Sequence, residues 1–142
     1  MPEQSNNKFE LKILSPKGTT YDQHVSFTKL NTANGEIGIL PNHSALLTEL
    51  VPGELEVIDE HEKDLYFIPR GFAHVHPDKV VILTPYVEHV STIDYERAKV
   101  AKKRAEEELK LAKDDISKAR ANLALLKSKA RIEIVEKEKI TR

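Results

Sequence analysis

The sequence predicts an α+β fold, with an antiparallel β-sandwich in residues 1–90 and a helical domain in residues 91–142. All 5 Gly and 7 Pro lie at or before Pro85, and these residues mark turns and interrupt helices. Apolar residues recur at every second position in the first part and at every third or fourth position in the second. The first part holds 7 Lys and Arg against 13 Asp and Glu, a net charge of −6, and the second holds 15 against 10, a net of +5.

Short alternating runs predict eight or more strands in the first 90 residues. Leu55 and Val57, for example, alternate with Glu54 and Glu56 on the opposite face. Further runs lie, among others, at residues 9–13, 25–30, 65–68, 73–75 and 80–83. Turn residues separate the runs at 15–18, 34–35, 60–64 and 77–79. Strands of this length and spacing are typical of a two-layer antiparallel structure.

Helical periodicity begins after residue 90. The pattern Ser91-Thr92-Ile93-Asp94 predicts a helix start with Ser91 as the N-cap. Either Asp114 or Asp115 can cap a second helix. Two apolar stripes with spacings of three and four predict an antiparallel pair packed through an alanine-rich seam: Ala98, Ala101, Ala105, Leu109 and Ala112, then Ile116, Ala119, Leu123, Leu126, Ala130 and Ile134.

The joint between these helices contains neither Gly nor Pro, the usual residues of a committed helix end. The same residues are therefore compatible with one helix of about 48 residues, roughly 70 Å long. An alanine seam buries little surface, at ~0.8 kcal/mol per methyl-sized group, so opening the hairpin costs on the order of several kcal/mol. Two interpretations stay open, a static hairpin and a conformational switch in which the hairpin extends.

The basic residues of the helical domain also allow two interpretations. Asp94, Arg97 and Arg104 lie close in phase on the first helix, and Lys127 and Arg131 are four residues apart on the second. In a folded hairpin these cations can converge on a polyphosphate, to which Arg gives bidentate contacts. Charges of this kind more often form a solvated helix face.

No combination of residues indicates an enzyme. His74 and His76 lie on one face of a strand and could share a metal, but the chain has no Cys and no carboxylate pair lies nearby. We therefore interpret them as solvent-facing strand residues. The sequence lacks a nucleophile elbow, a phosphate loop and a Rossmann motif, and the adjacency of His43 and Ser44 does not make a catalytic triad. We predict no catalytic residues and no metal ligands.

The expected partners are proteins. No apolar run approaches the roughly 18 residues that span a bilayer, and the N-terminal MPEQSNNKFE lacks the pattern of a signal or transit peptide, so we expect a soluble, unprocessed chain. The net +5 of the helical domain raises the alternative of a nucleic-acid-binding arm. However, Tyr95 is the only aromatic residue after residue 90, and the interspersed glutamates repel phosphates. A non-enzymatic coiled-coil adaptor is a second alternative, which leaves the motifs of the first half unexplained.

Those motifs carry a family resemblance. Residues 34–50 read NGEIGILPNHSALLTEL and closely resemble G-E-(L/I)-G-I-x-P-G-H-x-P-L-L-T-x-L, a motif of the epsilon subunit of the bacterial F-type ATP synthase. In the helical domain, IDYERA at residues 93–98 fits the family motif I/L-D-x-x-R-A. Shorter matches lie at residues 52–53, 71–75 and 78–83, so the resemblance covers the chain from Phe9 to about Glu136.

Two residues depart from the family pattern. Asn42 stands where Gly is usual, and Arg70 stands where Gly often precedes Gly71. Asn tolerates the left-handed backbone that Gly adopts, so this substitution is expected to be harmless. The sequence offers no physical explanation for Arg70.

The resemblance implies a protein without chemistry of its own. Family members form part of the central rotor stalk, where the β-sandwich binds the gamma subunit and sits on the c-ring, and proton-driven rotation is thereby coupled to ATP synthesis. The family's c-ring contacts fall on Glu36 and His43. The location implied is peripheral, on the cytoplasmic face of the bacterial cell membrane, with the membrane reached only through partner subunits.

The resemblance also implies a regulatory role for the helices. Folded down they permit turnover, and extended into the catalytic head they block rotation and inhibit ATP hydrolysis. The helical domain is cationic and suits acidic loops of the beta and alpha subunits. The candidate contacts with the catalytic head are Lys118, Arg120, Lys127, Lys129 and Arg131.

In some members ATP binds the folded hairpin as a regulatory ligand, and no cofactor is required. Lys127 stands where the ATP-binding members carry Arg, and Lys keeps the charge but loses the planar fork, so weaker binding is expected. The matching ATP-binding positions are Glu88, Ile93, Asp94, Arg97, Ala98, Arg104, Lys127 and Arg131.

Overall fold

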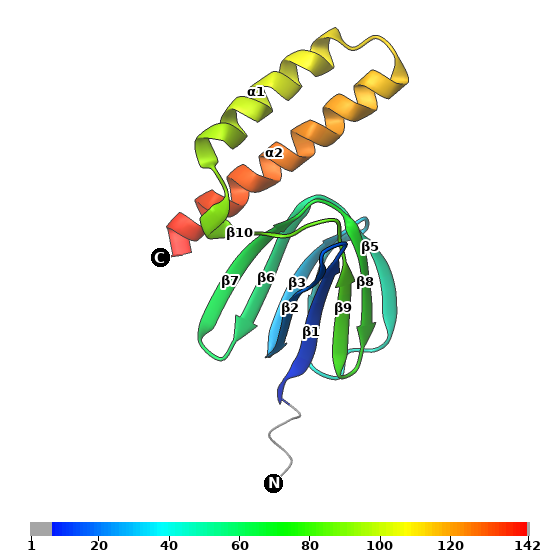
Figure 1. The fold of residues 1–142 in the computed structure, drawn as a ribbon, viewed down its shortest axis with the longest axis vertical. Coiled ribbons are helices and arrows are strands. Elements are labelled where there is room, and N and C mark those ends of the chain that lie inside the picture. The colour runs from blue at the N-terminus through cyan, green and yellow to red at the C-terminus, as the bar shows by residue number, and fades with distance from the viewer. Residues whose placement is uncertain (1–6, 142) are drawn as a thin grey trace.

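The strands of the chain come first and the helices last, as Figure 1 shows for the computed structural model, which describes residues 7–141. Residues 1–6 and 142, and with them most of the segment for which no signal or transit peptide is predicted, lie outside the described residues. The predicted α+β class, a β-sandwich followed by a two-helix hairpin, is confirmed. The elements are β1 (Phe9–Ser15), β2 (Gly18–Val25), β3 (Phe27–Thr32), β4 (Gly35–Ile39), β5 (Leu46–Leu50), β6 (Gly53–Asp59), β7 (Glu62–Ile68), β8 (Gly71–His76), β9 (Lys79–Leu83), β10 (Glu88–His89), the 3-10 helix η2 (Val90–Thr92), α1 (Tyr95–Leu111) and α2 (Asp115–Thr141).

The strands form one continuous sheet in the order β10-β7-β6-β3-β5-β8-β9-β1-β2, with β4 paired to β3. A single residue pair, Thr32 with Leu50, joins β3 to β5, and at this corner the sheet folds into two layers. The pairing of β1 with β9 is parallel, with Glu10 beside Lys79, a departure from the antiparallel pattern of the other described strands.

The core between the layers follows from the alternation in the sequence. Leu11 and Ile13 of β1 and Val80 and Ile82 of β9 are completely buried, and residues of β3, β6 and β8 pack against them. Each large side chain of this kind contributes about 1.5–3 kcal/mol when it is removed from water. The sandwich is therefore a framework that can hold surface residues in fixed positions.

Two departures from the family pattern have a structural explanation. Asn42 has a φ of 70°, so it adopts the left-handed conformation predicted for it. Gly71 has a φ of 146°, and a Cβ built on it would lie 2.0 Å from the carbonyl oxygen of Leu83. At this bend Gly71 must be Gly, but position 70 need not be. The side chain of Arg70 is exposed and has room, while its carbonyl accepts a hydrogen bond from Thr84 Oγ1.

The first helix begins later than the sequence predicts. Asp94 is the N-cap of α1, because its Oδ1 accepts a hydrogen bond of 3.0 Å from the backbone N–H of Arg97. The prediction of Ser91 as N-cap is wrong. Ser91 lies in η2, where its N–H donates to His89 Nδ1 over 3.1 Å, and a capping carboxylate three residues later starts the helix instead.

The joint between the helices is a short extended segment. Ala112 has a ψ of 133°, and the Oδ1 of Asp114 accepts a hydrogen bond of 2.6 Å from the N–H of Ser117. This bond stabilises the ionised carboxylate and lowers the pKa of Asp114. Of the two predicted caps, Asp114 caps α2 and Asp115 is its first residue. The chain therefore adopts the hairpin here rather than the single long helix.

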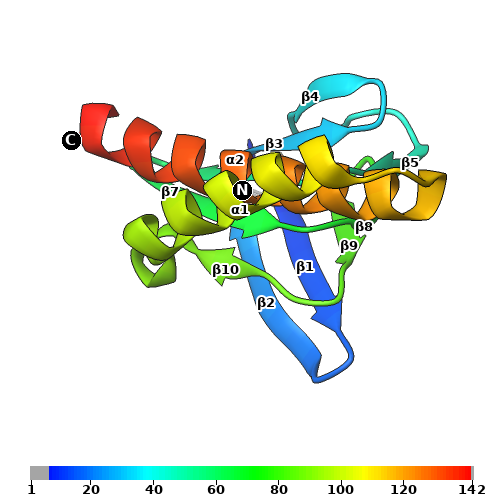
Figure 2. The same ribbon diagram turned by 90° about the horizontal axis from the view of Figure 1, so that it is seen from above.

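The seam between the helices is made of small side chains. Ala98 and Ala105 of α1 are buried against α2, in which Ala121 and Ser128 are buried one heptad apart. Figure 2 shows the two helices side by side across the top of the sandwich. The alanine-rich seam of α1 is as predicted, although Ala101 is exposed.

The stripe predicted for the seam side of α2 has a different role. Only Ala130 and Ile134 are buried, and they pack against the sheet rather than against α1. The predicted seam positions Ile116, Ala119, Leu123 and Leu126 are exposed. The physical reason is visible in Figure 1, where the first half of α2 rises away from the sandwich and only the second half lies on it.

Candidate functional site

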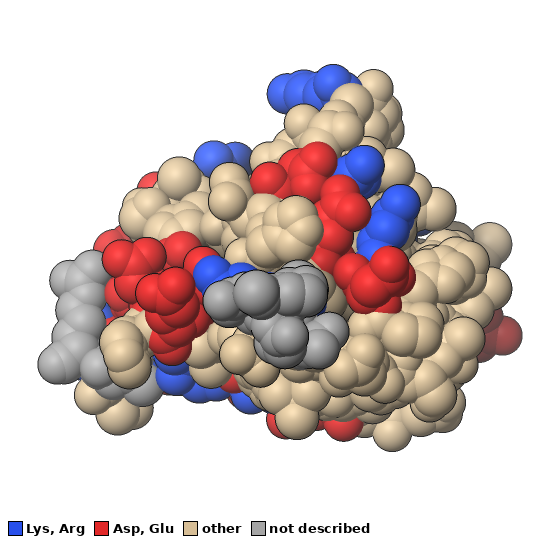
Figure 3. Space-filling view, turned by 90° about the horizontal axis from the view of Figure 1, so that it is seen from below, with Lys and Arg blue, Asp and Glu red and all other residues tan. Residues whose placement is uncertain are grey.

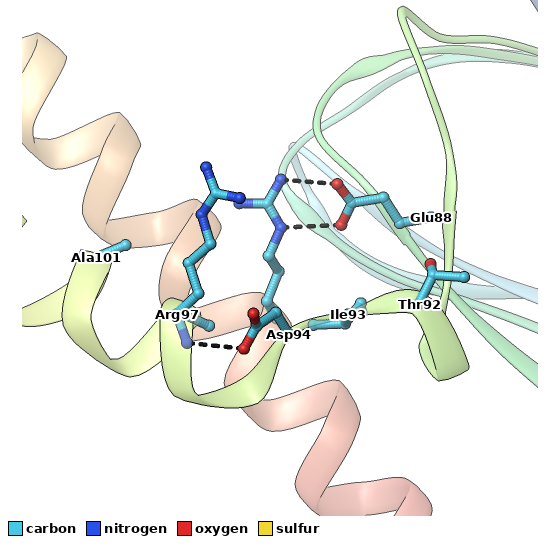
Figure 4. A pocket seen from close by; sticks show the side chains of 8 residues that line it. Glu88, Thr92, Ile93, Asp94, Arg97 and Ala101 are labelled. Carbon is cyan, nitrogen blue, oxygen red and sulfur yellow. Dashed lines mark hydrogen bonds and ion pairs between the residues drawn. The ribbon is translucent and has the colours of Figure 1, made fainter.

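A pocket of about 290 Å³ lies where the end of the sheet, η2 and both helices meet. Figure 4 shows Glu88 on the sheet side and Arg97 on the helix side of this pocket. The lining residues come from β10, from the turn that follows it and from the facing sides of α1 and α2: Glu88, Thr92, Ile93, Asp94, Arg97, Ala98, Ala101 and Arg131.

An ion pair between α2 and the sheet closes one side of the pocket. Arg131 Nε donates to Glu88 Oε1 over 3.0 Å, and Nη2 donates to Glu88 Oε2 over 3.2 Å and to the hydroxyl oxygen of Tyr86 over 3.2 Å. The guanidinium carbon lies 4.4 Å from the centre of the Phe67 ring. Burial disfavours the charged guanidinium, but the hydrogen bonds to Glu88 outweigh this effect and raise the pKa of Arg131.

The first turn of α1 forms the opposite side. Asp94 is occupied as the helix cap, and the capping bond to the backbone of Arg97 is drawn in Figure 4. The guanidinium of Arg97 forms no ion pair within the described residues. The pocket therefore offers one available cation, Arg97, and a second, Arg131, that is already paired with Glu88.

The structure brings together six of the eight residues that the resemblance assigns to ATP: Glu88, Ile93, Asp94, Arg97, Ala98 and Arg131. Arg104 and Lys127 do not line the pocket. Thr92 and Ala101 line it and were missed. Ala101 follows Arg97 by four residues, so helical periodicity could have identified it, whereas the position of Thr92 depends on the η2 turn.

The pocket has the chemistry of a small polar site. Its volume is close to the lower end of the roughly 300–1,000 Å³ of typical ligand sites. A polyphosphate would meet Arg97 directly and would gain Arg131 only if this side chain exchanged Glu88 for the ligand. Such an exchange is feasible because both side chains are partly exposed, at 24% for Arg131 and 31% for Glu88.

The predicted c-ring residues lie on β4 and in the loop that follows it. Glu36 is exposed on β4, 3.8 Å from the ammonium of Lys29. His43 is partly buried in the loop, with its Nδ1 2.8 Å from the carbonyl oxygen of Ser44. Figure 2 shows β4 at the edge of the sandwich, where a partner can reach it.

The predicted catalytic-head contacts are spread along α2. Lys118, Arg120 and Lys129 are exposed, and Lys127 and Arg131 are partly buried. Arg131 points to Glu88 of the sheet, so it can reach a partner only if α2 leaves the sandwich.

An apolar face covers the outside of β5, β8 and β9. Phe72 pairs with Leu83 on one side and with Glu49 on the other, and Leu47 lies on β5 opposite His74. Leu47 is 69% exposed and Phe72 and Leu83 are each 51% exposed. Large apolar side chains gathered on one face of a sheet indicate a surface that another protein covers. We call Leu47, Phe72 and Leu83 the apolar sheet face.

The end of the sandwich opposite the helices is rich in acidic side chains. Figure 3 shows Asp and Glu in groups on this face, with fewer Lys and Arg between them. Part of the negative charge of residues 1–90, a net of −6, lies in these groups.

The metal pair considered from the sequence, His74 and His76, is a pair of neighbouring rings whose planes are tilted by 51°. The imidazoles of His74 and His76 lie 4.1 Å apart, centre to centre. Within residues 7–141 there is no group of three or more His, Cys, Asp or Glu placed to hold a metal ion. Neither helix in this part of the chain has the length and apolar character needed to cross a bilayer.

Comparisons with known proteins point to one family. Two family models match the chain in succession: the beta-sandwich domain of the ATP synthase Delta/Epsilon chain over residues 8–90, and its long alpha-helix domain over residues 91–136. The chain is 39% identical over 128 residues to an ATP synthase epsilon chain of Clostridium novyi, which covers 89% of this chain and 97% of the relative. It is 34% identical over 125 residues to that of Bacillus velezensis, covering 88% and 95%.

The fold also matches solved assemblies. A chain in the Euglena gracilis mitochondrial ATP synthase, determined as an OSCP/F1/c-ring assembly, superimposes with a TM-score of 0.81 at 26% identity, covering 94% of this chain and 82% of that one. A chain in the central stalk and c-ring assembly of the Tetrahymena thermophila enzyme gives a TM-score of 0.62 at 16% identity, which shows the fold alone.

Proposed function

The chain belongs to the ATP synthase delta/epsilon family, and from this premise we propose that it is the epsilon-type rotor subunit of a bacterial F-type ATP synthase. It is a non-catalytic subunit of the central stalk, and it helps to couple proton translocation to ATP synthesis. The observation that carries this proposal is the match of both family domains, in order, over residues 8–136. The location that follows is peripheral, on the cytoplasmic face of the membrane and held there by partner subunits.

We assign the apolar sheet face to the gamma subunit. Leu47, Phe72 and Leu83 expose apolar surface that one protein partner would remove from water, at about 25 cal/mol per Å². Phe72→Asp is expected to weaken co-purification with the gamma subunit, because it places a charge at the centre of the face. Leu40→Asp is the matched control, since Leu40 is exposed but follows β4, outside this face. Equal loss in both variants would contradict the assignment.

The c-ring contact is assigned to Glu36 and His43 at the edge of the sandwich. Glu36 is exposed and His43 is partly exposed, and Glu36 already attracts one cation, Lys29. A basic loop of a partner would compete for the same carboxylate. Glu36→Gln is expected to weaken attachment of the assembled head to the membrane sector, measured by sedimentation of ATPase activity with membranes.

The helices are proposed to inhibit ATP hydrolysis when they extend into the catalytic head. The exposed residues Ile116, Leu123 and Leu126 support this state, because the hairpin leaves them without cover. In a continuous helix they would join one stripe with alternating spacings of three and four, made of Leu109, Ala112, Ile116, Ala119, Leu123 and Leu126. The extended arm would thus present one long apolar stripe, with the exposed cations Lys118, Arg120 and Lys129 available to acidic loops.

ATP is proposed to bind the pocket and favour the folded hairpin. Its phosphates would be held by Arg97, and Arg131 would contribute after leaving Glu88, with charge-assisted contacts of about 1.5–3 kcal/mol each. Millimolar ATP is expected to raise the melting temperature and slow proteolysis after residue 90. Arg97→Gln should abolish both effects, whereas Arg120→Gln, outside the pocket, should keep them. No response of the unmodified chain to ATP would exclude the site.

The inhibitory role is tested by truncation after residue 90 within the assembled complex. We expect coupling to remain and ATPase activity to rise. Because truncation uncovers Leu65 and Phe67, which α2 buries, thermal unfolding of the shortened subunit must be measured in parallel. Unchanged ATPase activity in a folded truncated subunit would refute inhibition by the helices.

A further inference from the structure

Three neighbouring strands present a row of side chains beneath α2. Glu88 of β10 is in register with Phe67 of β7, and Phe67 is in register with Glu54 of β6. Residues paired directly across neighbouring strands point to the same face of a sheet. The row therefore reads carboxylate, phenyl ring, carboxylate. We call Glu88, Phe67 and Glu54 the sheet row.

The helix above carries the complementary side chains at spacings of three. Arg131 pairs with Glu88 and lies over the Phe67 ring, Ile134 packs in the cluster that contains Phe67, and Lys137 pairs with Glu54. Positions three apart share one face of a helix. Charge and shape thus match along the whole row, with cation, isoleucine and cation over carboxylate, ring and carboxylate.

The Lys137 end of this contact is a partly buried ion pair with two hydrogen bonds. Lys137 Nζ donates to both carboxylate oxygens of Glu54, over 3.1 and 2.8 Å, and the Glu54 side chain is only 14% exposed. Burial disfavours the charged ammonium, yet the hydrogen bond to Glu54 leaves the pKa of Lys137 raised. If α2 lifted, Glu54 would keep Lys29, at 3.8 Å, as its remaining cation among the described residues.

The two ends of the row have different relations to the pocket. Glu88 and Arg131 line it, so a nucleotide that takes Arg131 would dissolve that ion pair. Lys137 and Glu54 do not line it, and the apolar contact of Ile134 is also outside. Binding in the pocket would therefore leave two of the three contacts in place.

We propose that the sheet row is a docking site that fixes the folded position of α2 without nucleotide, with Lys137 and Glu54 as the ion pair dedicated to this task. The proposal rests on the proposed function, in which the hairpin is a movable arm. The arm is held by charge at both ends of an apolar contact, and the pocket shares only the Arg131 end. Nucleotide binding then changes the stability of a folded position that α2 already occupies without it.

The test is hydrogen exchange of the purified full chain without nucleotide. In Lys137→Gln and in Glu54→Gln, the amides of residues 130–141 are expected to exchange about tenfold faster, as for loss of one partner of a partly buried ion pair. The matched control is Lys129→Gln, because Lys129 is exposed on the same helix and forms no ion pair within residues 7–141. Amides of β8 and β9 serve as the internal reference and are expected to stay unchanged.

A charge swap and a cross-link decide between docking and general destabilisation. The double variant Glu54→Lys with Lys137→Glu is expected to recover most of the protection, which a merely weakened helix would not. A zero-length carbodiimide should join Lys137 to Glu54 in the unmodified chain. The reference cross-link is between Lys63 and Glu56, an ion pair at 3.0 Å in which both residues belong to the sandwich. Exchange in Lys137→Gln no faster than in Lys129→Gln, or no recovery in the swap, would overturn the proposal.

The exchange test of the docking site and the truncation test of inhibition can succeed or fail independently. Faster exchange in Lys137→Gln together with unchanged ATPase after truncation would keep the docking site and refute inhibition. The opposite pair of results would keep inhibition and refute the docking site.

Discussion

The sandwich and the hairpin differ in the size of the apolar side chains that they bury. The sandwich encloses a core of large residues such as Leu11, Ile13 and Phe9, all at most 2% exposed. The hairpin seam is built from Ala98, Ala105 and other small side chains, and several large apolar residues of α2 stay outside it. Because apolar burial is the main favourable term in folding, the sandwich is the stable part and the hairpin depends on what it is docked against.

Because the two regions are packed so differently, regulation can act on the hairpin without opening the sandwich. Lifting α2 from the sheet requires breaking the apolar contact of Ala130 and Ile134 and two ion pairs, whereas opening the sandwich requires exposing its whole core. A partner or ligand that contributes a few kcal/mol can shift the first equilibrium and leave the second unchanged. The following predictions test whether the two regions are energetically as different as their packing indicates.

The largest effect is expected in the sandwich core. Leu11→Ala should lower the free energy of unfolding by about 2–5 kcal/mol, because a completely buried side chain leaves a cavity. Chemical denaturation followed by circular dichroism measures the loss. Leu47→Ala, on the exposed sheet face, should stay within about 0.5 kcal/mol of the parent. A small effect of Leu11→Ala would show that the core is less tightly packed than its burial indicates.

Ile134→Ala is expected to release the hairpin selectively. Ile134 is 2% exposed and packs with Leu65 and Phe67, so its truncation should weaken docking of α2 by about 2–4 kcal/mol. Hydrogen exchange should accelerate in α2 while strands β8 and β9 keep their protection. Leu126→Ala is the control, on the same stripe but 54% exposed. Simultaneous loss of protection in both regions would show that they unfold as one unit.

The same contrast explains what could be predicted from the sequence. Alternation and turn residues predicted the strands, because burial between two layers imposes a period of two. The left-handed conformation of Asn42 was also predicted, from the tolerance of Asn for it. The resemblance, not spacing alone, identified six lining residues of the pocket.

The hairpin was harder to predict because its local signals are ambiguous. Ser91 and Asp94 are both good N-cap residues, and only the η2 turn decides between them. Helix α2 has small or apolar residues on more than one face, so periodicity could not show that Ile134 packs on the sheet while Ala121 faces α1. The sheet row depends on the register of three strands, which no local pattern encodes.

A smaller effect is expected at the start of α1. Asp94→Ala should destabilise the helix by about 1 kcal/mol, because it removes the acceptor for the N–H of Arg97. Ser91→Ala should destabilise the helix by less than Asp94→Ala, since Ser91 does not cap α1. Exchange rates of the amides in the first turn of α1 measure both. A larger loss in Ser91→Ala would mean that η2, rather than the Asp94 cap, controls the entry into the hairpin.

The smallest effect is expected from acidification at the edge of the dock. Burial raises the pKa of Glu56, but the hydrogen bond from Lys63 and the charges of Lys137 and Lys29 outweigh it, so the pKa lies below its ordinary value of 4.5. Ionised Glu56 therefore stabilises the native state above pH 4.5, and this contribution is lost as the pH falls through the lower native value. The effect is small because the two influences oppose each other. Amides near the Lys137 end of α2 should lose protection from hydrogen exchange in this acid range. Glu56→Gln should weaken that pH dependence. An unchanged acid profile in this variant would assign the transition to other carboxylates.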